Sequence, residues 1–247
     1  MVELFDDEEL HLLYRNGPMK IIQSPSVFSF SLDAVLLAHF TWVPFNKDRR
    51  ILDLCSGNGV IPLLLSNRTK ASITGLEIQN RLVNMAERSI IYNKLTNQID
   101  MIHGDLREKQ RELVQGSFDL VTCNPPYFKT PAESELNDLE HFTIARHEVL
   151  CTLEDVVKAC KLYVRPGGKV TIVYRPTRLV ELITLLSKYN LEPKRMRFIY
   201  PKRGKDANIV LVEAVRDGKS GVKIEDPLFV YEKDGTYTEE AKEIIYG

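Results

Sequence analysis

This sequence of 247 residues lacks several features that define other classes of protein. No apolar run reaches the ~20 residues that a helix needs to cross a bilayer, and the acidic segment 1–9 lacks the basic and then apolar pattern of a signal peptide. Positive charge is not in excess either, because 33 Lys and Arg stand against 34 Asp and Glu. We therefore expect a cytoplasmic protein without a membrane partner, and not a uniformly basic nucleic-acid coat.

Cysteine is scarce as well. The four cysteines form neither a Cys-x-x-Cys pair nor a zinc-ligand spacing with histidine. Three of them lie in apolar or strand-like segments, as free buried thiols do in a reducing compartment. We therefore expect no disulfide and no metal site. The remaining composition, 44% hydrophobic and 27% charged, is that of an ordinary globular protein.

From about residue 50, short apolar runs alternate with helical patterns. Strands are expected at 50–54, 73–77, 99–103, 118–123, 169–174, 195–200 and 208–215. Helices are expected at 31–40, 60–67, 81–92, 153–164 and 179–189. This alternation predicts an α/β protein with a Rossmann-like, mostly parallel seven-stranded sheet and helices on both faces. The last two strands have no helix between them, so they predict a terminal hairpin that adds an antiparallel strand.

The flanking segments read differently from this core. We expect an N-terminal appendage over 1–48, with short strands and a helix packed on the core, a catalytic core over 49–216, and a C-terminal tail over 217–247 that belongs to the same domain. Residues 124–150 fit neither the strand nor the helix pattern, and they contain three prolines. A loop of that length in a compact domain is usually functional.

A glycine-rich loop, Asp-Leu-Cys-Ser-Gly-Asn-Gly at 53–59, stands where a strand gives way to a helix. In doubly wound sheets, ligands bind beyond the carboxyl ends of such strands. Gly57 and Gly59 remove Cβ atoms, which allows the backbone to approach a ligand, and the next helix points free N–H groups at the same place. The loop is not G-x-G-x-x-G. Its Asp53 would repel a pyrophosphate and suits an ammonium group.

Two further acids follow the next two strands. Glu77 comes 18 residues after Gly59 and ends the second strand, where an acid commonly binds ribose hydroxyls. Asp105 follows the third strand and can accept from an adenine amine. Together with Asp53, these acids describe a ligand with an amine, a ribose and an adenine but no phosphates. That ligand is S-adenosylmethionine, with S-adenosylhomocysteine as the product. The predicted cofactor residues are Asp53, Cys55, Ser56, Gly57, Asn58, Gly59, Glu77, Ile78, Gly104, Asp105, Leu106 and Asn124.

The tetrapeptide Asn124-Pro125-Pro126-Tyr127 directly follows the fourth strand, so it opens onto the same edge. An exocyclic amine of adenine is a poor nucleophile because its lone pair is delocalised into the ring. The side-chain carbonyl of Asn124 and the backbone carbonyl of Pro125 can accept from its two N–H bonds and free that lone pair, while Tyr127 stacks on the base. The alternative is a Pro-rich turn with a packed tyrosine. We predict Asn124, Pro125, Pro126 and Tyr127 as catalytic residues.

These motifs resemble a known family. The glycine-rich loop and Glu77 resemble class I methyltransferases, and the N-P-P-Y motif resembles enzymes that methylate adenine, guanine, cytosine or glutamine nitrogens. Over roughly residues 17–235, the chain resembles the bacterial valine-tRNA (adenine-37 N6)-methyltransferase family, although many relatives have Gly or Ala at positions 55 and 56. The resemblance implies methyl transfer to N6 of adenine 37 in a valine tRNA, and it implies that Asp33 lies near the methionine end of the cofactor.

Other substrates stay open at this point. A glutamine methyltransferase of release factors usually carries a longer helical domain than the 52 residues before Asp53, and a DNA adenine methyltransferase usually carries a target-recognition domain. Another RNA, such as ribosomal RNA, is a further alternative. The alternative from a different class of function is a non-catalytic RNA-binding module on the same fold. The presence of Asp53, Glu77, Asp105 and Asn124 argues against it.

Candidate RNA contacts are basic and scattered. Residues 194–205 hold six of them, interleaved with Phe198 and Tyr200, which suits phosphates and bases. The alternative is a solvated edge strand guarded by Lys and Arg, and the sequence favours neither. The predicted substrate residues are Tyr127, Lys129, Arg146, Lys194, Arg195, Arg197, Lys202, Arg203 and Lys205. Arg175 and Arg178 are expected beside strand ends. The predicted partner is tRNA, with no metal and no obligate protein partner.

Overall fold

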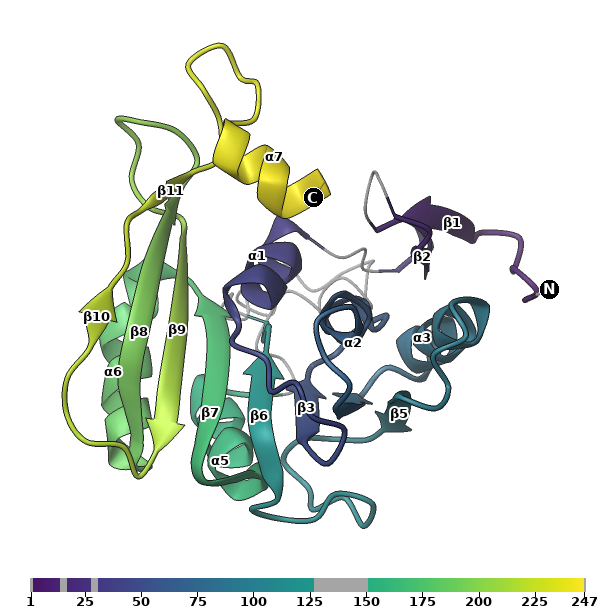
Figure 1. Cartoon of the computed structure of the whole chain (residues 1–247), viewed down its shortest axis with the longest axis horizontal. Helices are drawn as coiled ribbons and strands as arrows, with labels where there is room; N and C mark the ends of the chain where they lie inside the picture. Colours follow the sequence, from purple (N-terminus) through teal and green to yellow (C-terminus); the bar gives the residue numbers. More distant parts are fainter. Residues whose placement is uncertain (1, 14–16, 28–30, 127–150, 247) are drawn as a thin grey trace, which may run out of the picture.

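A twisted central sheet organises the computed structural model, which describes residues 2–13, 17–27, 31–126 and 151–246 (Figure 1). Along the sheet the main strands run in the order β8-β9-β7-β6-β3-β4-β5. Their bounds are β3 Arg50–Leu54, β4 Ser72–Glu77, β5 Ile99–His103, β6 Phe118–Cys123, β7 Val164–Tyr174, β8 Leu191–Tyr200 and β9 Ile209–Arg216. Two short strands, β10 (Lys223–Ile224) and β11 (Leu228–Phe229), pair with the outer side of β8.

Strand direction confirms the predicted architecture. β9 runs antiparallel to both of its neighbours, β7 and β8, whereas β3 pairs in parallel with β4 and β6, and β4 with β5. Every residue of β6 is buried, as expected for a parallel strand covered on both faces. Alternate side chains enter opposite cores: Ile51 packs in one cluster and Leu52 in the other.

Helices cover both faces of the sheet (Figure 1). One face carries α1 (Leu32–Phe40), α2 (Val60–Ser66) and α3 (Asn80–Tyr92), and the other carries α5 (Leu153–Tyr163) and α6 (Leu179–Lys188). The last helix, α7 (Glu239–Tyr246), packs against α1. A capping box in which Thr152 and Asp155 bond each other's backbone N–H starts α5. In the described part of the chain, no helix is long and apolar enough to cross a membrane.

Several element bounds differ from those predicted. β7 begins at Val164, five residues before the apolar run, because Val164 already pairs with Phe118 ahead of a register shift. β8 likewise begins at Leu191. The strand β1 (Glu9–Leu12) was not predicted, because its polar and apolar residues alternate over only four positions and most of them are exposed. It pairs antiparallel with β2 (Lys20–Gln23). We call β1 and β2 the N-terminal hairpin.

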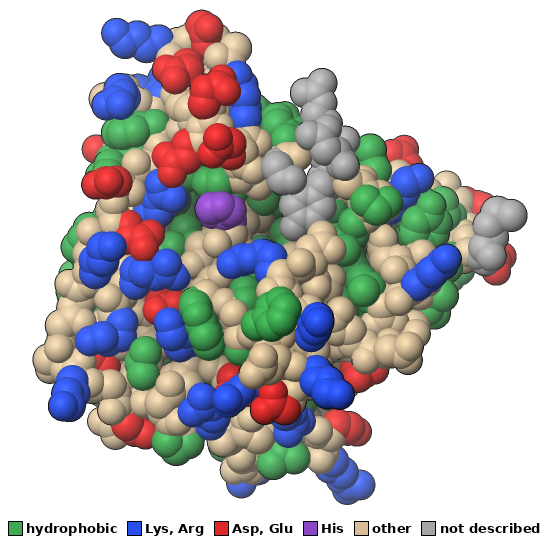
Figure 2. All heavy atoms as spheres, viewed as in Figure 1, with side chains coloured by type: hydrophobic (Ala, Val, Ile, Leu, Met, Phe, Trp, Pro, Cys, Tyr) green, Lys and Arg blue, Asp and Glu red, His purple; other side chains and the backbone are tan. Residues whose placement is uncertain are grey.

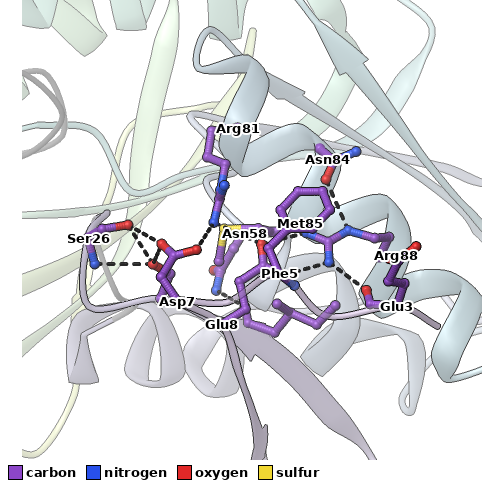
Figure 3. A network of polar contacts seen from close by, with 12 residues as sticks. Glu3, Phe5, Asp7, Glu8, Ser26, Asn58, Arg81, Asn84, Met85 and Arg88 are labelled. Carbon is purple, nitrogen blue, oxygen red and sulfur yellow. Dashed lines mark hydrogen bonds and ion pairs between the residues drawn. The ribbon is translucent and has the colours of Figure 1, made fainter.

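A buried carboxylate fastens the N-terminal hairpin to α3 (Figure 3). The side chain of Glu8 is fully buried. Its oxygens accept from both terminal nitrogens of Arg88, at 2.5 and 2.6 Å, and lie 3.0 Å from Nη2 of Arg81. The backbone N–H of Phe5 donates to the same carboxylate, and the Phe5 ring faces both guanidinium groups. A buried ion pair with this many hydrogen bonds is satisfied geometrically.

Burial raises the pKa of Glu8, but the Arg88 and Phe5 hydrogen bonds and both arginine charges outweigh it, so the pKa lies below its usual value. A lowered pKa means that the pair stabilises the folded protein at neutral pH and that this contribution is lost as the pH falls below about 4.5.

We predict that Glu8→Ala loosens the N-terminal hairpin, because it leaves two guanidinium groups without their buried partner. Removing one partner of a buried pair costs about 3–5 kcal/mol. The measurement is hydrogen exchange at the Ile22 amide, which donates to Ser89 Oγ on α3. Glu9→Ala is the matched control, since Glu9 is exposed and contacts only His11 among the described side chains. Equal exchange rates in both variants would show that Glu8 does not hold the N-terminal hairpin to α3.

Candidate active site

A pocket lies at the carboxyl ends of β3, β4, β5 and β6. It brings together most of the residues that the sequence singled out: Cys55, Ser56, Gly57, Asn58, Glu77, Ile78, Gly104, Asp105, Leu106, Asn124 and Pro126. The structure adds residues that the sequence analysis did not single out: Ala34, Val60, Ile61, Leu76, Gln79, Leu82 and Cys151. Four parallel strands thus deliver their loops to one place, as the Rossmann-like arrangement requires.

Backbone conformation explains one glycine of the loop. Cys55, Gly57 and Gly59 all have positive φ angles, of 56°, 56° and 80°. At Gly57 a Cβ would meet nothing, so glycine is favoured there by conformation and not by lack of space. At Gly59 a Cβ would lie 3.0 Å from the Cβ of Ala86 on α3. Gly59 is not among the residues that line the pocket. Its absent Cβ makes room for α3, and its predicted cofactor contact stays a prediction.

Gly75 is a structural requirement that the sequence analysis missed. It lies within β4, opposite Asp53 of β3. A Cβ there would stand 2.5 Å from Met101 Sδ and 2.6 Å from Ser56 Oγ. Gly75 therefore leaves space for the glycine-rich loop to fold over the end of β4. A glycine inside a strand pattern often marks such a close approach, and this was the available signal.

Glu77 joins two of the backbone segments that line the pocket. Its Oε2 accepts from the N–H of Gly57 at 2.9 Å, and its Oε1 accepts from the N–H of Gln79 at 3.0 Å. Burial raises the pKa of Glu77, and these backbone N–H groups oppose that rise. Each carboxylate oxygen has a second acceptor direction. One side chain can therefore order the glycine-rich loop and still accept from a ribose hydroxyl, which is the role predicted for it.

Asp105 lines the pocket but already has a partner. Its carboxylate accepts from Nε and Nη2 of Arg107, at 2.9 and 2.5 Å from Oδ2. Partial burial raises the pKa of Asp105, and the Arg107 hydrogen bonds and charge more than offset this, so the pKa is lowered. The carboxylate is thus held ionised and in place. Arg107, two residues further along the chain, was not predicted from the sequence.

Asp53 is fully buried and does not line the pocket. Its Oδ1 accepts from Thr122 Oγ1 at 2.6 Å, while its Oδ2 has no hydrogen-bond partner among the described residues. Ser56 Oγ, at the pocket wall, is likewise buried and unpartnered there. Burial raises the pKa of Asp53 to about 7, and the nearby hydroxyls of Thr122 and Ser56 oppose that rise. The Oδ2 of Asp53 and the lone pairs of the Ser56 hydroxyl are acceptors that fit a ligand with N–H donors, such as an ammonium group.

Strand register places Asn124 beside the glycine-rich loop. Cys123, the last residue of β6, pairs with Leu54, the last residue of β3. Asn124 and Cys55 therefore leave adjacent parallel strands, and both line the pocket. Pro126 lines it too, and Pro125 is buried. Tyr127, Lys129 and Arg146 lie outside the described residues, so their predicted roles stay predictions.

The amide of Asn58 connects the glycine-rich loop to the N-terminal hairpin. Asn58 Nδ2 donates to the carbonyl of Ile22 at 3.1 Å, and both residues are buried. Asp33, by contrast, does not line the pocket. It is buried on α1, with a carboxylate oxygen 3.6 Å from Arg175 Nη2, and its neighbour Ala34 is the α1 residue at the pocket wall. The predicted cofactor contact of Asp33 stays a prediction.

Within β8, the predicted basic residues are tied into the protein. Arg195 bonds the carboxylates of Glu213 and Glu225, and Arg197 bonds Glu240 and the carbonyl of Asp226. Lys194 donates to the carbonyl of Lys219. On the face over β8 and β9, acidic side chains are interspersed among Lys and Arg (Figure 2). For these three residues, the structure favours a role in holding β8 to β9 and to the C-terminal tail over an RNA contact.

The fold and the pocket define a class I methyltransferase: a sheet with one antiparallel strand, a glycine-rich loop after β3, acids after β4 and β5, and an Asn-Pro-Pro turn after β6. The chain belongs to the methyltransferase small domain family, whose model matches residues 18–189. This finding confirms the predicted class of enzyme and, with it, S-adenosylmethionine as the cofactor. The unpartnered oxygens of Asp53 and Ser56 fit the ammonium group of that cofactor.

Similar proteins support this assignment. A tRNA1(Val) (adenine(37)-N6)-methyltransferase of Shewanella putrefaciens is 30% identical over 182 residues, which cover 73% of this chain and 74% of the relative. Among solved structures, a predicted O-methyltransferase from Agrobacterium tumefaciens has a TM-score of 0.68 at 22% identity, covering 86% of this chain and 94% of its own. Geranyl diphosphate C-methyltransferase from Streptomyces coelicolor, solved with S-adenosyl-L-homocysteine, has a TM-score of 0.58 at 10% identity. The match covers 75% of this chain and 78% of that enzyme's chain.

We predict that Gly75→Ala weakens cofactor binding at least tenfold, because the new Cβ pushes Ser56 and the glycine-rich loop away from β4. Overpacking of this kind also costs about 1–3 kcal/mol of stability. Calorimetric titration with S-adenosylhomocysteine measures the first effect and thermal unfolding the second. Thr74→Ala, on the same strand, is the control. Unchanged affinity in Gly75→Ala would show that the loop tolerates the displacement.

We predict that cofactor affinity rises as the pH is raised from 5.5 to 7.5. Asp53 is protonated below its pKa of about 7 and ionised above it, and only the ionised form attracts an ammonium group. The change approaches about tenfold per pH unit below the pKa. Asp53→Asn should flatten this dependence. Asp105→Asn should weaken binding and leave the dependence in place, since the Asp105 pKa is lowered. A pH dependence that survives Asp53→Asn would assign it to another group.

Proposed function

We propose that the protein transfers the methyl group of S-adenosylmethionine to the N6 amine of an adenine in tRNA, namely adenine 37 in the anticodon loop of a valine tRNA. The observation that carries the proposal is the position of Asn124 and Pro126 in the wall of the cofactor pocket. The relative in Shewanella putrefaciens, which has this activity in its name, supports the choice of substrate.

In this proposal, the protein contributes alignment and hydrogen-bond acceptors. The bound cofactor supplies an electrophilic methyl group. The side-chain carbonyl of Asn124 and the backbone carbonyl of Pro125 accept from the two N–H bonds of the amine, which draws the nitrogen toward tetrahedral geometry. Acceptors that are fixed before the reaction stabilise the developing positive charge without reorganisation. The buried Pro125 and the two ring-locked φ angles fix this turn.

Different residues around the pocket bind different parts of the cofactor. Glu77 accepts from the ribose, Asp105 accepts from the adenine amine, and Ser56 at the pocket wall binds the ammonium group with the buried charge of Asp53 close behind it. Because Glu77 also bonds Gly57, ribose binding and loop order depend on the same carboxylate. The proposed chemistry requires neither a metal nor a second protein, and a tRNA substrate implies a cytoplasmic enzyme. Tyr127 is proposed to stack on the target base once that base has left its own stack.

The test is incubation of the protein with labelled S-adenosylmethionine and total tRNA, followed by digestion and separation of the nucleosides. We expect label in N6-methyladenosine. Asn124→Ala should lower the rate at saturating cofactor by about 10²–10³-fold, as removal of one preorganised hydrogen-bonding group does, and calorimetric titration with S-adenosylhomocysteine separates this loss from any change in cofactor affinity. Asn46→Ala is the matched control, since Asn46 is exposed at the opposite edge of the sheet.

Sequencing the labelled tRNA then tests the valine assignment. Label that enters ribosomal RNA or a release factor instead of tRNA would replace the substrate and keep the reaction class. Cofactor binding without transfer to any of these would overturn the proposal and favour a non-catalytic module.

A further inference from the structure

The turn after β8 lies on the same edge of the sheet as the active site. β8 runs parallel to β7, because both are antiparallel to β9. The registers through β7 and β9 set Met196 of β8 level with Cys123 of β6, so β8 ends, at Tyr200, four residues beyond β6 at the same edge of the sheet. β6 and β8 are three strand spacings apart in the order β6-β7-β9-β8, which is about 14 Å across the sheet at ~4.8 Å per strand, and the four further residues of β8 add about 13 Å along it. A polynucleotide can reach both places along one edge.

A groove opens at this turn, between residues 201–206 and the loop 231–235 of the C-terminal tail. It is lined by Pro201, Lys202, Lys205, Asp206, Tyr231 and Gly235. The tail is fixed to the turn by backbone hydrogen bonds, since the N–H of Val230 donates to Tyr200 at 2.9 Å and that of Tyr231 to Pro201 at 2.8 Å. In Figure 1 the two loops stand at the upper left, above β8 and beside α7. Both walls are thus parts of one hydrogen-bonded extension of the sheet.

The lysines of this groove differ from the basic residues within β8. Lys202 and Lys205 are exposed, and neither ammonium group forms an ion pair within the described ranges, whereas Arg195 and Arg197 are bound to carboxylates. With Asp206, the ionisable lining groups sum to one positive charge. Such a charge, unused by the fold, suits a single phosphodiester.

An aromatic surface stands beside these charges. Tyr231 is 36% exposed, and its ring stacks on that of Tyr237, with centroids 5.0 Å apart and an angle of 23° between the planes. Tyr237 in turn meets Tyr246 edge to face at 6.1 Å. On the turn side, Arg203 covers Phe229 at 4.5 Å. A nucleobase can extend the Tyr231–Tyr237 stack, and base–aromatic stacking contributes to binding without a sequence code.

We propose that this groove is a second RNA-binding site, which holds a nucleotide of the strand that carries the target adenine. Lys202 and Lys205 bind the phosphate and Tyr231 stacks on the base. The proposal rests on the proposed function, since it takes the substrate to be RNA. It gives the C-terminal tail a role: the tail builds one wall of the groove and keeps the RNA aligned while its adenine occupies the active site. Arg175, which donates to the Asn208 carbonyl at 2.8 Å, lies at the edge between the two sites.

The experiment compares Lys202→Ala/Lys205→Ala and Tyr231→Leu with the wild-type protein in steady-state methylation of tRNA at saturating cofactor. We expect the KM for tRNA to rise at least tenfold in the double variant, with kcat changed less than twofold and cofactor affinity unchanged. The slope of log affinity against log salt should also fall by about 1, as for one lost phosphate contact. Tyr231→Leu should raise the KM and leave the salt slope unchanged.

The matched control is Lys47→Ala/Lys70→Ala, which removes two exposed lysines near the amino ends of β3 and β4, at the opposite edge. An equal rise in KM for this control, or an unchanged KM and salt slope in the groove variants, would overturn the second site. Thermal unfolding of each variant identifies a loss of folding.

RNA binding is measured separately with Asn124→Ala protein and an anticodon stem-loop, by fluorescence anisotropy. If the wild-type protein transfers no methyl group to RNA, the proposed function fails; the anisotropy of the groove variants still decides whether the groove binds RNA. If the stem-loop binds neither the wild-type protein nor Asn124→Ala, and a release factor is methylated instead, both proposals fail together.

Discussion

The active site depends on the parallel register of β3 with β4 and β6. In this register Asp53 lies opposite Gly75, Leu54 opposite Leu76, and Leu54 again opposite Cys123. Because all three strands end at the same level, the glycine-rich loop, Glu77 and Asn124 leave the sheet side by side. A shift by one residue would turn the buried side chains of β3 to the wrong core. The packing of the two cores therefore also sets the geometry of the pocket.

Buried carboxylates then connect the pocket to the rest of the molecule. Glu77 holds Gly57, and the glycine-rich loop in turn holds the N-terminal hairpin through Asn58 and the carbonyl of Ile22. Glu8 fastens that hairpin to α3, the helix that follows Glu77. The contacts form a closed circuit of loop, hairpin and helix. Such a circuit keeps the pocket in one shape, because no member can move without breaking a buried polar contact.

Sequence alone was enough for the features encoded within short segments. Alternating apolar runs and helical patterns specified the sheet, and a strand-loop-helix with Gly57 and Gly59 specified the cofactor site. The features that were missed depend on contacts between distant segments. Gly75 matters because Met101 and Ser56 meet above it. The strand β1 forms because it pairs with β2 and because its Leu10 packs against residues of α3. The ion pairs of Arg195 and Arg197 join β8 to β9 and to the tail, so their residue types alone could not separate a structural arginine from an RNA contact.

The same distinction explains how a nearly neutral protein can act on a polyanion. Arginines in the sheet and on α3 pair with acids such as Glu213 and Glu8, and these pairs serve packing. The two lysines of the proposed groove, Lys202 and Lys205, lie instead in a loop at the carboxyl edge, where side chains do not carry the fold. A net charge of −1 therefore gives no measure of RNA affinity. Position decides the use of each charge: inside the sheet it joins strands, and at the edge, as at Lys202, it remains available to a phosphate.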